Sequence, residues 1–154
     1  MLSLCRRRGT RSITSRVIDR PSHVRDAVDM TDVQRVIARY IDVWNATDPA
    51  RRRELIGEVF TENAAYSDPL AAVRGHDAID QLVAAAQAQF AGLQFSLGGP
   101  IDAHHDQARF TWHLSAPGIE EPVVIGFDVA ILNDGRVRDV YGFLDKVPSG
   151  AVAG

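Results

Sequence analysis

The stretch "GFDVAILNDGRV", Gly126 to Val137, decides the fold of this 154-residue chain. An apolar run ends here at Asn133, Asp134 and Gly135, and a second run follows. This triplet favours a tight hairpin turn, because glycine accepts positive φ at no steric cost. The flanking segments, 122–132 and 136–145, are therefore predicted to be paired antiparallel strands.

Upstream of this hairpin the apolar spacing changes from period two to helical period. Residues 93–97 and 108–115 predict two more strands, and 64–67 predict a short one. Residues 74–90 predict a helix with Ile79 and Phe90 on its apolar side.

Two further helices are predicted nearer the N-terminus. The first begins at a capping box, with Thr31 as N-cap, and carries Tyr40 and Trp44 on its apolar stripe. The second begins with Asp48 as cap and Pro49 in the first turn, and carries apolar residues through Phe60. We expect the arginine run 51–53 to form its solvated face.

This order of elements predicts an α+β fold. Three N-terminal helices would pack on one face of a strongly curved, mostly antiparallel sheet, giving a cone with a pocket between the two layers. Residues 30–148 form a single domain in this interpretation, and residues 1–29 and 149–154 are predicted to be disordered. The first segment would be a dispensable extension, since Met30 immediately precedes the first helix signal; an organelle transit peptide is the alternative.

Composition excludes several classes of protein. Residues 1–29 hold seven arginines and three aspartates, a net charge of +4. Because the whole chain carries −3, residues 30–154 carry −7. An acidic body is unsuited to nucleic acid. The single cysteine, Cys5, excludes a disulfide framework and favours a reducing, cytoplasmic location. No stretch is apolar enough to span a membrane, and no P-loop, dinucleotide fingerprint or metal motif is present, so we expect no cofactor.

Three polar residues lie at positions where burial of the polar group would be costly or where the backbone conformation is restricted. Asp128 interrupts the apolar strand "VVIGFDVAIL", so its carboxyl must be protonated or hydrogen-bonded if it is buried. Tyr40 lies on an apolar helical stripe, so its hydroxyl needs an internal partner. Asp68 precedes Pro69, which biases it away from helical geometry. These residues suit a polar cluster inside an apolar cavity. The alternatives are an Asp68 that only forms a turn or caps a helix, a solvent-facing Asp128 and a Tyr40 that is ordinary core.

The segments "ARYIDVWNATD", "AAYSDPLAAVRGHDAI", "GFDVAILNDGRV" and "GFLDKV" resemble the nuclear transport factor 2-like superfamily. It includes ketosteroid isomerases, SnoaL-like polyketide cyclases, limonene-epoxide hydrolases and non-enzymatic binders. The resemblance to the ketosteroid isomerases implies Asp68 as general base, with Tyr40 and Asp128 as oxyanion-hole donors. Here the separation of Tyr40 and Asp68 is about one helical turn longer, and Phe143 stands near the place of a family tryptophan.

The resemblance thus implies a cofactor-free isomerase or cyclase that removes a proton α to a carbonyl of a steroid-like or polyketide-like substrate. A small hydrophobic ligand and a homodimer are expected. The alternative is a non-catalytic ligand-binding or dimerisation module; an epoxide hydrolase built on Arg109 ranks lower. The pocket walls are expected to be aromatic: Tyr40, Trp44, Tyr66, Phe90, Trp112 and Phe143.

Overall fold

The structure is a computed structural model that describes residues 30–148. Within this range an α+β fold is present, with three helices and one seven-stranded sheet. The segments predicted to be disordered, 1–29 and 149–154, lie outside the described residues.

The helices are α1 (Met30–Asn45), α2 (Pro49–Val59) and α3 (His76–Gln89). Helix α1 already includes Met30, one residue before the predicted cap. The predicted start of α2 is confirmed: the Asp48 carboxylate accepts a 2.9 Å hydrogen bond from the Arg51 backbone N–H, and Pro49 opens the helix. Helix α3 follows Gly75, which has φ 88°. Asp68 is therefore not its cap.

The strands are β1 (Phe60–Ser67), β2 (Ala72–Arg74), β3 (Gln94–Leu97), β4 (Asp102–His104), β5 (Gln107–Ser115), β6 (Val124–Asn133) and β7 (Arg136–Lys146). Strands β2 and β4 were not predicted, because three residues carry no usable periodicity. Phe60 was expected in the second helix but adopts extended geometry, φ −104° and ψ 144°, and begins β1. Asp134 and Gly135 have φ 51° and 77°, which confirms the predicted hairpin turn between β6 and β7.

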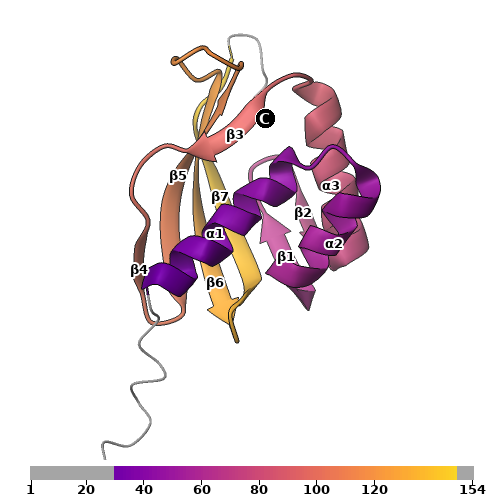
Figure 1. The fold of residues 1–154 in the computed structure, drawn as a ribbon, viewed down its shortest axis with the longest axis vertical. Coiled ribbons are helices and arrows are strands. Elements are labelled where there is room, and N and C mark those ends of the chain that lie inside the picture. The colour runs from indigo at the N-terminus through magenta and orange to yellow at the C-terminus, as the bar shows by residue number, and fades with distance from the viewer. Residues whose placement is uncertain (1–29, 149–154) are drawn as a thin grey trace, which may run out of the picture.

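The sheet has the order β2-β1-β7-β6-β5-β3, with β4 beside β3 on the same edge of β5. Only β1 and β7 pair in parallel among these strands; the other described pairs are antiparallel. Figure 1 shows the three helices gathered on one side of the curved sheet, with α1 crossing in front of β6 and β7. The prediction of a mostly antiparallel sheet that wraps helices is confirmed.

The core lies between the helices and the inner face of the sheet. Val33, Ile37 and Tyr40 of α1 are each at most 1% exposed, as the helical spacing predicts. Helix α3 contributes Ile79 and Val83, and β5 contributes Phe110. The Tyr40 ring packs edge-on against the Phe110 ring, with 5.6 Å between the ring centroids. This packing fixes the helical stripe over the sheet and places Tyr40 deep inside.

The arginine run of α2 is not a uniformly solvated face, and here the prediction is wrong. Arg52 is only 5% exposed, and its Nε donates a 2.6 Å hydrogen bond to Asp80 Oδ1 on α3. The reason is helical geometry: position 52 lies on the same face as the buried Leu55, Ile56 and Val59. Arg53 is largely exposed and approaches the other oxygen of Asp80 at 3.6 Å.

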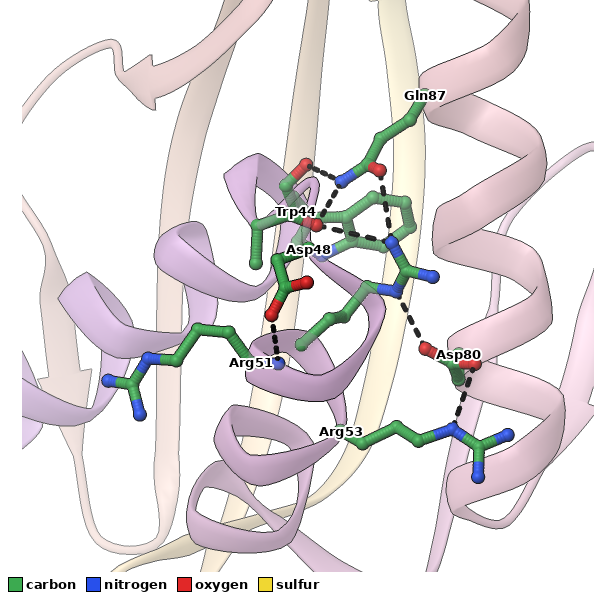
Figure 2. Close-up of polar contacts among 8 residues, drawn as sticks. Trp44, Asp48, Arg51, Arg53, Asp80 and Gln87 are labelled. Atoms are coloured by element: carbon green, nitrogen blue, oxygen red, sulfur yellow. Dashed lines mark hydrogen bonds and ion pairs between the residues drawn. The ribbon is translucent and has the colours of Figure 1, made fainter.

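The Arg52 network also holds the end of α1 against α3. The Arg52 guanidinium donates to the Ala46 carbonyl at 3.2 Å and to Gln87 Oε1 at 3.1 Å. Gln87 Nε2 donates in turn to the carbonyls of Trp44 and Ala46, at 3.0 and 2.8 Å (Figure 2). These carbonyls belong to the helix end, where no intrahelical donor is available. The network therefore anchors the backbone of Trp44, whose side chain faces the cavity described next.

Candidate functional site

A cavity of about 330 Å³ lies between the helices and the inner face of the sheet. Its walls are mostly apolar and come from α1, α3 and the strands. Among the described residues that line it, two are acidic, Asp68 and Asp128, and none is basic. Its lining comprises Tyr40, Ile41, Trp44, Tyr66, Asp68, Leu70, Ala71, Leu82, Ala85, Ala86, Gln89, Phe90, Phe95, Trp112, Leu114, Val124, Asp128, Leu144, Val147 and Pro148.

Tyr40 and Asp128 meet at the inner end of the cavity. The Tyr40 hydroxyl donates a 2.8 Å hydrogen bond to Asp128 Oδ2, so this phenol has the internal partner that its position requires. Asp128 is 2% exposed, which excludes the solvent-facing alternative. Its second oxygen, Oδ1, is buried and has no hydrogen-bond partner among the described residues. An unpartnered buried carboxyl oxygen is costly unless a proton or a ligand compensates it.

Burial raises the pKa of Asp128 from 3.8 to about 6. The polar hydrogens of Tyr40 and Trp112 act in the opposite direction and lower this pKa, while the charge of Asp68 raises it further. The Asp128 carboxyl is therefore protonated in a large fraction of molecules near pH 6, whereas an exposed aspartic acid would be ionised. Burial, helped by the charge of Asp128, also raises the pKa of Tyr40 well above its usual range, so this phenol stays a hydrogen-bond donor.

Asp68 follows β1 and is held by three donors. Its Oδ1 accepts the backbone N–H groups of Leu70 and Ala71, at 2.8 and 2.9 Å, which closes a tight turn around Pro69. Its Oδ2 accepts the Tyr66 hydroxyl at 2.8 Å. Asp68 therefore forms the turn and also lines the cavity, so the alternative in which it only forms a turn or caps a helix does not hold. Three donors aimed at one carboxyl group suit an ionised acceptor.

Gly142 brings the two aspartates close together. It is the β7 partner of Asp128, and the preceding residue, Tyr141, pairs with Ser67 of β1. A Cβ atom at Gly142 would lie 2.9 Å from Asp128 Oδ1 and 3.2 Å from the Cβ of Asp68. The missing side chain thus leaves the space in which the Asp128 carboxyl leans across β7 toward Asp68. The sequence-based predictions did not include Gly142, although a glycine at an inward-facing position of a predicted strand indicates extra space there.

Five of the six predicted wall residues line the cavity: Tyr40, Trp44, Tyr66, Phe90 and Trp112. The sixth, Phe143, does not, and this prediction is corrected: its side chain is 54% exposed. Strand alternation gives the reason, because Gly142 and Leu144 point inward and the residue between them must point outward. Leu144 lines the cavity instead, together with Phe95, which the sequence analysis did not single out.

The remaining candidate residues lie away from the cavity. Arg109 is exposed on β5 and pairs with Asp102 at 3.0 Å, so it has no place in the cavity wall. Within residues 30–148, no group of three or more His, Cys, Asp or Glu side chains could hold a metal ion. None of the helices in this range has the length and apolar character needed to cross a bilayer.

Comparison with known proteins gives the same fold and a family. No curated protein matches the chain. The structure of a "putative isomerase of the SnoaL-like family" from Agrobacterium tumefaciens is 39% identical, with a TM-score of 0.70, over 75% of this chain and 98% of that one. A "putative SnoaL-like polyketide cyclase" from Jannaschia is 20% identical, with a TM-score of 0.61, over 75% of this chain and 86% of that one.

A third solved structure, a "putative ketosteroid isomerase" from Kribbella flavida, is 18% identical, with a TM-score of 0.57, over 76% of this chain and 80% of that one. At this identity, and at that of the Jannaschia protein, the similarity shows the fold alone. The family model of the SnoaL-like domain matches residues 37–140, which includes Tyr40, Asp68 and Asp128. Together with the Agrobacterium relative, this match shows that the chain belongs to the SnoaL-like domain family.

Proposed function

We propose that this protein is a cofactor-independent isomerase or cyclase that removes a proton α to a carbonyl group of a small apolar substrate. The observation that carries the proposal is the pair of carboxyl groups in one cavity with different environments. Asp68 accepts three hydrogen bonds, whereas Asp128 is buried with one oxygen unpartnered. Two carboxyl groups in one site can serve as base and acid when their environments move their pKa values apart in this way.

In this proposal Asp68 is the base. Its Oδ1 is occupied by two backbone donors, so the α-proton goes to the free lone pair of Oδ2. The C–H electron pair becomes the C=C bond of an enolate, and negative charge develops on the carbonyl oxygen. An isomerase returns the proton from Asp68 to another carbon of the same substrate. In a cyclase the enolate carbon adds to a second carbonyl carbon of the substrate, the C=O π pair moves to that oxygen, and the resulting alkoxide takes the proton from Asp68.

Asp128 is the proton donor to the developing oxyanion. Tyr40 already donates to Asp128 Oδ2, so the acidic proton belongs on the opposite oxygen, Oδ1. Oδ1 is fully buried beside Gly142, so in this proposal the carboxyl group turns toward the cavity to reach a bound ligand. Tyr40 supports this donor through their hydrogen bond, and its raised pKa keeps the phenol protonated. A preorganised donor in a water-poor cavity stabilises an enolate more than water does.

A phenolate anion tests the oxyanion site because it mimics an enolate. We expect a nitrophenolate to bind the wild type and to bind more weakly to Tyr40→Phe. Because an ionised Asp128 repels the anion, the dissociation constant should rise up to about tenfold per pH unit above pH 6. A folded protein that shows no such binding at any pH from 5 to 8 contradicts the oxyanion site.

A second measurement tests the base. Wild type should convert 3-cyclohexen-1-one to its conjugated isomer, which is followed by ultraviolet absorbance. Asp68→Asn should lose at least about a hundredfold of that rate while the nitrophenolate still binds. Anion binding without any conversion of this or other β,γ-unsaturated ketones favours the alternative, a non-catalytic binding module of the same fold.

We also propose that two copies pair through the outer face of the sheet. Tyr141 and Phe143 of β7 are 48% and 54% exposed, and their cross-strand partners on β6 are Val129 and Phe127. These four side chains form a continuous apolar surface, which a second copy of the same surface would cover. The cytoplasmic location expected from the single cysteine stays a prediction.

A further inference from the structure

A second inward glycine, Gly126, lies beneath the Trp112 indole. Gly126 of β6 and Trp112 of β5 are direct cross-strand partners. A Cβ atom at Gly126 would lie 1.9 Å from Cζ2 and 2.1 Å from Cε2 of that indole. These separations are far below van der Waals contact, so any side chain at position 126 displaces the indole from its present place.

Absence of a side chain at Gly126 determines where the indole goes. A strand side chain ordinarily stands roughly perpendicular to its sheet, which at position 112 would direct the indole into the cavity. Here the indole instead leans across the neighbouring strand and lies on the Gly126 backbone, where it lines the cavity. The Phe95 ring packs against it edge-on, with 5.4 Å between ring centroids.

We propose that Gly126 is a specificity-determining residue, which keeps the cavity deep enough for a ligand of two fused rings by letting the Trp112 indole occupy the space above the Gly126 backbone. Gly126 itself touches no reacting atom and acts through Trp112. The inference concerns the size of ligand accepted by the same cavity as the proposed function, but it does not depend on the acid and base roles given to Asp128 and Asp68.

An alanine at position 126 should therefore close part of the cavity. The nearest empty space for a displaced indole is the cavity that it now lines, since Phe95 blocks movement toward β3. A one-ring ligand would still fit beside the displaced indole, whereas a two-ring ligand would overlap with it. The expected effect is a change in size selectivity rather than a uniform loss of binding.

Neutral hydrocarbons test this inference separately from oxyanion chemistry. Benzene and naphthalene would be titrated into the full chain, and the indole N–H resonances of its two tryptophans followed by NMR. For Gly126→Ala we expect naphthalene to bind at least about tenfold more weakly than to wild type, and benzene to change by less than about threefold. Gly57→Ala is the matched control, because its Cβ meets nothing within 4 Å and it lies on an exposed part of α2.

A double variant shows whether the effect passes through Trp112. In a Trp112→Val background the clash no longer exists, so Gly126→Ala should leave naphthalene affinity unchanged, and the Trp44 resonance reports the binding. This pair also keeps the test decisive if Gly126→Ala alone does not fold. Equal selectivity in wild type and Gly126→Ala, or the same loss in the Trp112→Val background, overturns the proposal. A folded wild type that binds neither hydrocarbon also overturns the proposal. The proposed function is then still tested separately, by nitrophenolate binding.

Discussion

Replacing Asp128 with asparagine should change the pH dependence of stability. The free energy of unfolding of the variant, compared with that of wild type, should be more favourable at pH 8 than at pH 4. The folded chain holds the Asp128 proton with a pKa of about 6, against an ordinary value of 3.8. Between these values the folded state binds more protons than the unfolded state. Wild-type stability therefore decreases as pH rises through this window, the reverse of a salt-bridged aspartate.

The size of the effect follows from the shift. A difference of about two pKa units corresponds to about 3 kcal/mol at 1.36 kcal/mol per unit, and Asp128 is buried enough that solvent screening is small. An asparagine at this position would have the same shape but no charge, so it avoids this cost. Its amide N–H groups would meet the site where Oδ1 now lacks a partner, which adds a penalty that does not depend on pH.

Urea denaturation at several pH values, followed by tryptophan fluorescence, measures this difference. We expect the free energy of unfolding of Asp128→Asn minus that of wild type to increase by about 2.5 kcal/mol from pH 4 to pH 8, because an unfolded aspartate with a pKa of 3.8 is already partly ionised at pH 4. Asp134→Asn is the control, because Asp134 is exposed in the hairpin turn at φ 51°, where asparagine is well tolerated. A difference between Asp128→Asn and wild type that stays constant from pH 4 to pH 8 refutes the reasoning.

Two further predictions concern stability and assembly. Arg52→Leu leaves Asp80 as a buried charge without its 2.6 Å partner and should cost about 3–5 kcal/mol of unfolding free energy. Arg53→Ala removes a largely exposed arginine that is 3.6 Å from the same carboxylate and should cost less than about 1 kcal/mol. Chemical denaturation compares the two variants, and equal losses contradict the buried network. Phe143→Glu should convert a dimer to a monomer in analytical ultracentrifugation. The thermal midpoint should change little, since this residue is 54% exposed. A wild type that is monomeric at all concentrations contradicts the proposed pairing through the outer face of the sheet.

Helical and strand spacing predicted most of the architecture because each element has one clear apolar face. The stripe through Tyr40 and Trp44 had to face the core, and the Asn133–Gly135 turn had to pair its flanking strands. The errors fall where a residue's neighbours come from elsewhere in the chain. Arg52 has the same side chain as its exposed neighbours in the arginine run 51–53. Its position on the helix nevertheless directs it toward Asp80, a partner 28 residues away.

The candidate site shows the same division. The sequence alone determined which residues were costly to bury: an aspartate in an apolar strand, a tyrosine on an apolar stripe and an aspartate before a proline. Only the tertiary structure decided how they meet, because strand register sets which side chains share a face. Register placed Asp128 opposite Gly142 and Trp112 opposite Gly126, and turned Phe143 outward. Glycines shape this cavity by the side chains they lack, and the space a glycine leaves becomes visible only when the strand beside it is in place.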